Sequence, residues 1–216
     1  MQKIKYLINY VISTFFRPFP NNSLLINSYK ARTIQDKLNL RTPYTNLKLI
    51  SFLKNYSKDK TNLCIFEFGS GSSTLFFEDH FDQVFSVEHD KEWFEIISTN
   101  IKKANVYLVP PKKVSNPVCG SKKLGFRNLD FVDYVNFIDS LGEKFDVIFI
   151  DGRARQDCLK LAKQYLKPGG IIILDDSNRL RYKNIFLQES LNKETLHFSG
   201  FGTFVPSIHK TSMIIS

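Results

Sequence analysis

The sequence is poor in cysteine. Its three cysteines, Cys64, Cys119 and Cys158, are scattered along 216 residues and odd in number. This argues against a disulfide framework and predicts a reducing, cytoplasmic environment. None of the Cys/His spacings typical of zinc sites occurs either, so the sequence offers no metal site of that class.

The composition is that of a globular protein with an excess of positive charge. Hydrophobic residues make up 43% and charged residues 24%, which excludes a disordered tail and allows one well-filled core. The formal net charge of +9 suggests an acidic partner or an anionic substrate.

The first residues, KIKYLINYVISTFFRPFP, superficially resemble a signal peptide. However, Asn9 and Ser13 interrupt the apolar run, and no small-residue cleavage site follows it. The run is also shorter than the about 20 apolar residues that a membrane-spanning helix needs. Helical spacing predicts an amphipathic helix that ends before Pro18, with an apolar face of Ile4, Leu7, Ile8, Val11 and Phe15. We expect it to pack on the domain, with a membrane surface or a partner protein as alternatives.

Two regions follow from the pattern: a helical N-terminal extension over 1–60 and a larger domain over 61–216. In the extension, Thr42 and Pro43 are the expected cap and first residue of a helix over 44–57. Beyond it, strands and helices alternate, with strands predicted over 63–68, 83–88, 106–109, 146–151 and 170–176 and helices over 73–80, 91–103 and 155–166. These continuous apolar strands predict an α/β, doubly wound, mostly parallel Rossmann-like sheet.

The end of the chain differs from this pattern. Two strands, near 195–198 and 211–215, follow each other with no helix between them, so they are expected to pair antiparallel. The stretch 110–142 is long for a connection between strands. We expect it to contain a loop and a helix over 129–141, and such insertions often cover an active site.

A glycine turn follows the first strand of the domain, in CIFEFGSGSST. Ligands of doubly wound sheets bind at the carboxyl ends of the strands, and Gly69 and Gly71 allow close approach there. A dinucleotide would place pyrophosphate at this turn, but the Glu67 carboxylate would repel it and would favour a ligand with an ammonium and a sulfonium group. Thr74 also departs from the dinucleotide fingerprint.

A second acid lies at the end of the next strand, in VFSVEHD. Glu88 is about 20 residues beyond the glycine turn, where an acid can accept hydrogen bonds from both ribose hydroxyls of a nucleoside. Together with the turn, it predicts a nucleoside-binding site.

In order along the chain, EFGSGSST, VFSVEHD, FDVIFIDGRA and LKPGGIIILDD resemble the class I S-adenosylmethionine-dependent methyltransferases, over residues 62–216. This resemblance implies a seven-stranded sheet whose last strand is antiparallel. It also implies S-adenosylmethionine as cofactor, with Glu67 at its amino group and Glu88 at its ribose. The expected cofactor-binding residues are Glu67, Gly69, Ser70, Gly71, Ser72, Ser73, Glu88, His89 and Asp151.

Aspartates at the ends of two further strands are the candidate catalytic residues. Asp151 and Asp176 are expected to face the crevice, where either can orient an acceptor or act as its general base. With Asp175, they also resemble the acids of metal-dependent catechol-type O-methyltransferases, although Asp176 replaces the asparagine of that family. A divalent metal is therefore possible but not favoured. His209 is a further candidate base.

Basic residues near the crevice suggest how an acceptor binds. Arg153 and Arg155, in DGRAR, are expected to bind a carboxylate or phosphate of the substrate. Lysine pairs at 102–103, 112–113 and 122–123, with Arg127, can attract an anionic acceptor, or they are simply solvated.

The sequence therefore predicts methyl transfer to an oxygen of a small-molecule or glycan-like acceptor. The Asn/Asp-Pro-Pro-aromatic motif of amino-methylating DNA enzymes is absent after the fourth strand, so nucleic acid is not favoured as substrate. Alternatives are a nicotinamide-dependent dehydrogenase and a non-catalytic protein that binds nucleic acid or a membrane surface. An aminopropyl transferase is a third.

Overall fold

The structure, a computed structural model, describes residues 22–216. The amphipathic helix predicted over 4–15 lies outside the described residues. Within them, no helix has both the length and the apolar character required to cross a membrane.

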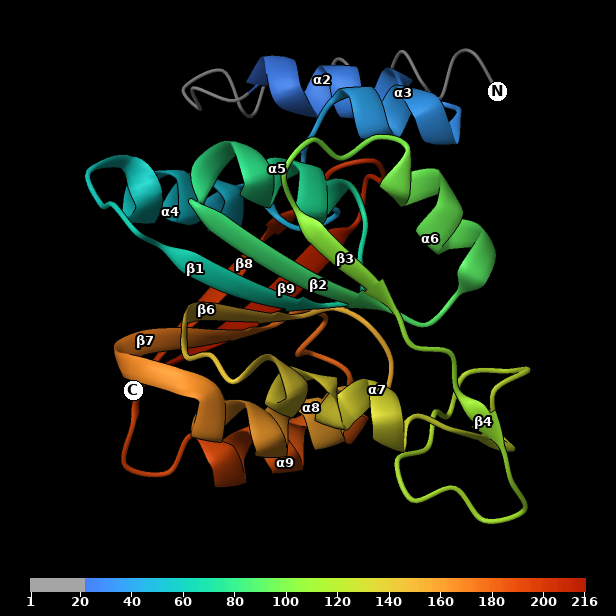
Figure 1. Cartoon of the computed structure of the whole chain (residues 1–216). Coiled ribbons are helices and arrows are strands. Elements are labelled where there is room, and N and C mark those ends of the chain that lie inside the picture. The colour runs from blue at the N-terminus through green and yellow to red at the C-terminus, as the bar shows by residue number, and fades with distance from the viewer. Residues whose placement is uncertain (1–21) are drawn as a thin grey trace.

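The centre of the molecule is a seven-stranded sheet with the strand order β3-β2-β1-β6-β7-β9-β8 (Figure 1). Strand β9 pairs antiparallel with β7 and with β8, whereas the pairs among β3, β2, β1, β6 and β7 are all parallel. This confirms the predicted mostly parallel sheet with its antiparallel last strand. The strands are β1 Cys64–Phe68, β2 Gln83–Glu88, β3 Asn105–Leu108, β6 Phe145–Ile150, β7 Leu166–Leu174, β8 Glu194–Phe201 and β9 Ile208–Ile215.

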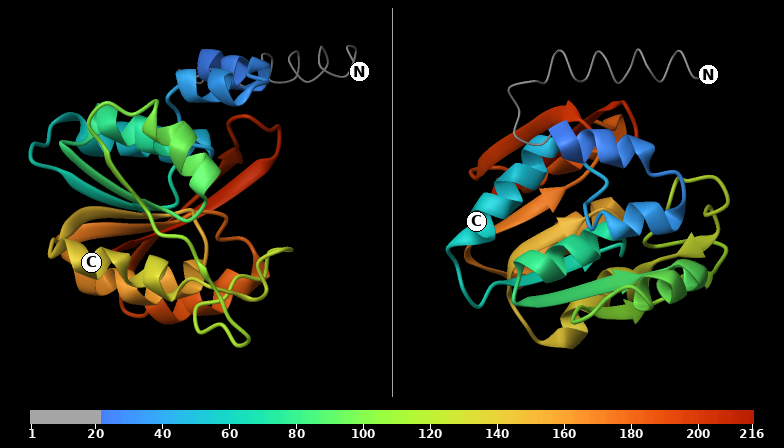
Figure 2. Two further views of the ribbon diagram at one scale, coloured as in Figure 1. Left: turned by 45° about the vertical axis from the view of Figure 1, so that its right-hand side comes forward. Right: turned by 90° about the horizontal axis from the view of Figure 1, so that it is seen from above.

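Helices cover both faces of the sheet, as expected for a doubly wound fold (Figures 1 and 2). One face carries α4 Leu47–Lys58, α5 Ser72–His80 and α6 Lys91–Ser98, and α2 Asn22–Lys30 and α3 Ile34–Asn39 lie outside them. The opposite face carries α7 Val132–Asn136, α8 Arg155–Ala162 and α9 Leu180–Glu189. Sequence analysis did not predict α9.

The pleat of β1 shows how the sequence builds the two halves of the core. All five residues of this strand are buried, so the strand contacts helices on both faces. Phe66 and Phe68 belong to the apolar cluster under α7 and α8, and Ile65 belongs to the cluster under α4 and α5. Because side chains alternate along a strand, Glu67 points to the same side as Ile65, beneath α5.

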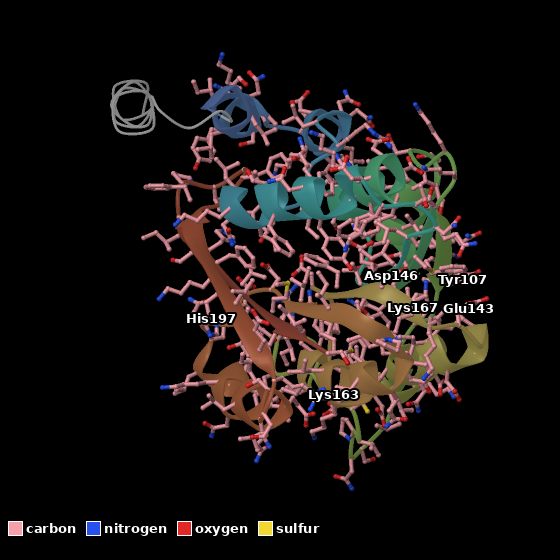
Figure 3. All side chains as sticks on the ribbon, turned by 90° about the vertical axis from the view of Figure 1, so that its left-hand side faces the viewer. Tyr107, Glu143, Asp146, Lys163, Lys167 and His197 are labelled. Carbon is pink, nitrogen blue, oxygen red and sulfur yellow. The ribbon has the colours of Figure 1, made fainter. Side chains whose placement is uncertain are left out.

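Two local predictions need correction. Helix α4 is capped by Asn46, whose side chain accepts a hydrogen bond from the Leu49 amide at 3.0 Å, rather than by Thr42. The strand predicted over 170–176 begins earlier, because the KPGG segment over 167–170 already lies inside β7. There the Lys167 ammonium lies 2.8 Å from an Asp146 carboxylate oxygen, and Figure 3 shows these two side chains side by side, near Glu143.

The insertion over 110–142 contains a small two-stranded sheet, β4 Lys112–Lys113 with β5 Leu129–Asp130. Helix α7 and the 3-10 helix η1 Phe137–Leu141 replace the single predicted helix, and a second short 3-10 helix, η2 Lys163–Tyr165, continues α8. The Asp130 carboxylate accepts three amide hydrogen bonds, from Val118, Cys119 and Val132. These bonds fix the base of the insertion beside the carboxyl end of the sheet.

Candidate functional site

A cavity of about 550 Å³ opens where β1, β2 and β6 end. Pockets that bind small molecules usually have volumes of about 300–1,000 Å³. The cavity brings together most of the predicted site residues: Gly69, Ser70, Gly71, Ser72, Ser73, Glu88, His89, Asp151 and Arg153. Glu67 and Asp176 do not line it, and Arg155 lines a neighbouring cavity instead.

The glycine turn after β1 packs directly against the turn after β6. Gly69 has φ +96°, a conformation that favours glycine, and a Cβ there would lie only 2.6 Å from the Gly152 Cα. A Cβ on Gly152 would in turn collide with the Tyr134 hydroxyl. Two neighbouring glycines therefore allow the ends of β1 and β6 to meet at the cavity floor.

Glu67 supports this turn from below, and the expectation that it contacts the ligand needs correction. Its side chain is fully buried beneath α5. The carboxylate accepts hydrogen bonds from the Ser73 hydroxyl, from Thr74 Oγ1 at 2.5 Å and from Ser86 Oγ at 2.9 Å. Thr74 Oγ1 also accepts a bond from the Gly71 amide, so Glu67 acts on the turn through Thr74. Burial raises the pKa of Glu67 to about 7, although the three hydroxyls oppose this.

Glu88 is the acid that faces the cavity. One carboxylate oxygen accepts hydrogen bonds from the Ser70 amide and hydroxyl, both at 3.0 Å. The other accepts the His89 amide at 2.7 Å and the Asp90 amide at 2.9 Å. Burial alone would raise the pKa of Glu88, but His89 and these amides lower it. The carboxylate is thus ionised and fixed in position, with its second oxygen shared between β2 and the start of α6.

His89 connects Glu88 to Arg153. Its Nδ1 lies 2.6 Å from a Glu88 oxygen, and its Nε2 lies 3.4 Å from Arg153 Nε. Because Arg153 can only donate, Nε2 is the acceptor, and the imidazole proton belongs on Nδ1, facing Glu88. Both residues were predicted to belong to the site, and both line the cavity.

Asp151 and Arg155 form an ion pair at the edge of the cavity, with 2.5 Å between Oδ1 and the guanidinium. Arg155 is only 8% exposed and also donates to the Gly152, Asp175 and Asp151 carbonyls. Its donors are thus already used within the protein, which corrects its predicted role in substrate binding. No described residue donates to Asp151 Oδ2, and this oxygen remains available to a ligand.

Asp176, the other predicted catalytic residue, lies away from the cavity. Its carboxylate pairs with Arg179 and lies 3.4 Å from Arg155. Both guanidiniums bind it within the protein, and it does not line the cavity in which an acceptor would bind. We therefore correct its predicted role as a general base.

The acids at the ends of β6 and β7 do not fit a divalent cation. Among residues 22–216, Asp175, Asp176 and His209 offer one donor atom each within 4.8 Å of one another. However, Asp175 already accepts the Thr45 hydroxyl at 2.9 Å and the Thr211 hydroxyl at 2.6 Å, and Asp176 binds two arginines. The charge that a metal would compensate is already compensated by guanidiniums.

Sequence analysis missed several aromatic residues of the cavity. Trp93 donates its indole N–H to the Ser70 carbonyl at 2.8 Å, and Phe126 extends from the insertion. Tyr44 and Phe204 stack with 5.5 Å between their ring centroids and also line the cavity. Trp93 is the only tryptophan of the chain and follows Glu88 by five residues, a signal that could have been used. No such signal marks the other three.

The search for known relatives by sequence found neither a matching family model nor a matching curated protein. Solved structures do match. An O-methyltransferase from Bacillus cereus, in complex with S-adenosylhomocysteine, has TM-score 0.60 at 15% identity and covers 97% of each chain. A methyltransferase from Pyrococcus furiosus has TM-score 0.50 at 19% identity, over 78% of this chain and 81% of its own.

The chain has the class I methyltransferase fold. This confirms the fold that the motifs suggested, although these identities are too low to transfer an activity. A precorrin 8w decarboxylase from Methanobacterium thermoautotrophicum, with TM-score 0.51 at 15% identity over 81% of this chain and 92% of its own, is also similar. The fold alone does not identify the reaction, which depends on the residues of the site.

Proposed function

We propose that the chain is an S-adenosylmethionine-dependent methyltransferase that acts on an oxygen of a small-molecule or glycan-like acceptor. The observation that supports this most is the fixed, ionised Glu88 carboxylate at the rim of a cavity whose floor is the glycine turn. An acid at this place can accept both hydroxyls of a ribose.

The cofactor fits the residues that are present. Glycine backbone and the carboxylates of Glu88 and Asp151 suit a ligand with hydroxyls and positive charge, and Trp93 and Phe126 offer apolar surface for a nucleobase. S-adenosylmethionine, when bound, supplies a methyl group activated by a positively charged sulfur.

Methyl transfer then requires alignment of the acceptor and removal of its proton. Asp151 is suited to both tasks in this proposal. Arg155 holds one carboxylate oxygen, which leaves Oδ2 to accept the proton of an acceptor hydroxyl. The side chain is 27% exposed, so an acceptor in the cavity can reach it.

A comparison of cofactors tests the proposal against a dehydrogenase of related fold. We expect millimolar S-adenosylhomocysteine to raise the melting temperature of the protein by several degrees, because a ligand that binds only the folded state stabilises it. NAD⁺ at the same concentration should leave it unchanged. Stabilisation by NAD⁺ alone would refute the proposal in favour of the dehydrogenase.

A further inference from the structure

A second, larger cavity of about 980 Å³ lies beside the first. Its walls come from the insertion, from the start of α8 and from the start of α9. The two cavities share Lys123, Gly152 and Arg153. A molecule in the second cavity would therefore lie next to the end of β6, where Asp151 lines the first cavity.

The lining of this second cavity is strongly basic. Among the described residues that line it, the one carboxylate is that of Asp157, whose side chain lies 3.5 Å from the Lys160 ammonium. Seven cationic side chains line the same cavity: Lys122, Lys123, Arg127, Arg153, Arg155, Arg179 and Arg181. Such an imbalance in a concave site concentrates anions.

Five of these cations have no carboxylate partner in the part of the chain that the structure describes. Arg155 and Arg179 are paired with acids at the ends of β6 and β7. Among residues 22–216, no ion pair involves the remaining members, Lys122, Lys123, Arg127, Arg153 and Arg181. Surface cations are commonly unpaired, but five that converge on one cavity need a different explanation.

Two of the five are held in place by aromatic rings. The Arg153 guanidinium lies 5.0 Å from the centre of the Phe126 ring, and that of Arg181 lies 4.8 Å from the centre of the Tyr182 ring. The Arg181 Nε is buried and has no hydrogen-bond partner among the described residues. Burial and the nearby Arg155 lower the pKa of Arg153, so an anion here would relieve an uncompensated charge.

We propose that this cavity binds phosphate groups of the methyl acceptor, so that the substrate is a phosphate ester or diphosphate. This inference rests on the proposed function, because it assigns the acceptor of that reaction. A planar guanidinium binds two phosphate oxygens at once, which fixes orientation as well as affinity. Arg153 lies in both cavities and therefore places the anion beside the reacting hydroxyl.

The volume of the cavity favours a compact anion, since it falls within the range of small-molecule pockets. Two large apolar side chains lie beside the cations, Val118 at 79% exposed and Leu180 at 84% exposed. The phosphate can therefore come from a soluble metabolite or from a lipid-linked molecule. A phosphate group from either source would bind the arginines in the same way, so an experiment must distinguish the soluble molecule from the lipid-linked one.

Titration calorimetry with inorganic pyrophosphate tests the site directly. Arg153→Gln and Arg181→Gln should each weaken pyrophosphate binding at least fivefold, because each removes a cation from the cavity. Lys48→Gln, which removes one charge from an exposed position on α4, across the sheet, should change it less than twofold. No binding of millimolar pyrophosphate, or equal losses in all three variants, would overturn the proposal.

Binding of S-adenosylhomocysteine, measured on the same proteins, separates this inference from the proposed function. Arg181 does not line the first cavity, so Arg181→Gln should bind S-adenosylhomocysteine like the wild type. That result also shows that the variant is folded. If wild type binds S-adenosylhomocysteine but not pyrophosphate, the phosphate site is wrong and the methyltransferase stands. If it binds pyrophosphate but not S-adenosylhomocysteine, the anion site stands, but the proposed function is refuted and with it the assignment of the anion to a methyl acceptor.

Competition and vesicle binding complete the test. Pyrophosphate and S-adenosylhomocysteine should bind together, and mutual exclusion would place the anion in the first cavity and contradict the proposal. If the wild-type protein floats with phosphatidylglycerol vesicles and both arginine variants float less, the phosphate belongs to a lipid-linked molecule. If the wild-type protein does not float but still binds pyrophosphate, the phosphate belongs to a soluble molecule. If the protein binds RNA and neither arginine variant weakens this binding, the result contradicts the proposal that the cavity is the phosphate site.

Discussion

At the scale of single residues, two glutamates that look alike in the sequence have different roles. Glu67 and Glu88 each lie near the end of a strand. The Glu67 carboxylate is bound by three hydroxyls in the interior, whereas Glu88 is bound mostly by backbone amides at the cavity. Burial raises the pKa of both groups, but at Glu88 the His89 side chain, and after it the backbone amides, outweigh burial and lower the pKa, whereas the three hydroxyls at Glu67 do not.

Glu67 should make stability depend on pH. Its pKa in the folded protein is about 7, above the ordinary value of 4.5, so the folded state binds the proton more tightly than the unfolded chain. The stability of wild type relative to Glu67→Gln should therefore be greatest below pH 4.5 and should fall as pH rises toward 7. By the usual conversion, the loss is roughly 3 kcal/mol.

Urea denaturation at several pH values between 4.5 and 8 measures this difference. Glu92→Gln is the matched control, because it removes the same charge from an exposed position on α6, and its difference from wild type should not change with pH in this way. A rise in the relative stability of wild type with pH would contradict the account of Glu67.

At the scale of elements, Arg155 ties the ends of β6 and β7 to the start of α8. Its guanidinium lies between Asp151, which follows β6, and Asp176, which follows β7. The backbone is strained at the same place: Ala154 has φ +47° and Asp176 has φ +54°, a region that residues with a side chain rarely adopt. Such strain persists only where the surrounding contacts enforce it, and these ion pairs supply that enforcement.

We expect Arg155→Met to destabilise the protein by about 3 kcal/mol, because it removes a buried cation and leaves the half-buried Asp151 carboxylate without its ion-pair partner. The same variant should gain affinity for divalent cations, since free carboxylate oxygens are their preferred ligands. Millimolar Mn²⁺ or Ca²⁺ should therefore raise the melting temperature of Arg155→Met but not that of wild type.

Arg179→Met is the comparison for this experiment. Arg179 also pairs with Asp176, but its side chain is 47% exposed, and loss of an exposed pair costs less than about 1 kcal/mol. Equal destabilisation by the two variants, or equal stabilisation of wild type and Arg155→Met by metal, would show that Arg155 does not take the place of a cation.

At the scale of the whole molecule, the sequence predicted a mostly parallel sheet with an antiparallel end, but not the order of the strands within it. Continuous apolar segments such as CIFEF and FDVIFI are typical of strands covered on both faces, and they look alike wherever the strand lies in the sheet. Helix α9 was not predicted although half of its segment, LRYKNIFLQE, is apolar. Leu180 and Leu187 are exposed whereas Tyr182, Ile185 and Phe186 are buried, so the apolar residues do not all mark one buried face. The cap of α4 was misplaced because Thr42 and Asn46 both suit a helix start, and tertiary contacts decide between them.

The site was predictable only where a residue's place follows from the end of a strand. Gly69, Glu88 and Asp151 meet at one cavity for that reason. Glu67 lies one residue before the end of β1, and the pleat turns its side chain under α5. The pairing of Arg155 with Asp176 joins the start of α8 to the end of β7, and neither its existence nor its geometry can be read from sequence. The second cavity depends on the fold of the insertion, which has no regular pattern.

The central claim is that Glu88 anchors a nucleoside of the S-adenosylmethionine type in the first cavity. Titration calorimetry with S-adenosylhomocysteine on wild type and Glu88→Ala tests it most directly, with Glu92→Ala as the control for charge. We predict at least a tenfold loss of affinity in Glu88→Ala, or about 1.4 kcal/mol, and no change in Glu92→Ala. Equal affinity in wild type and Glu88→Ala would contradict the claim.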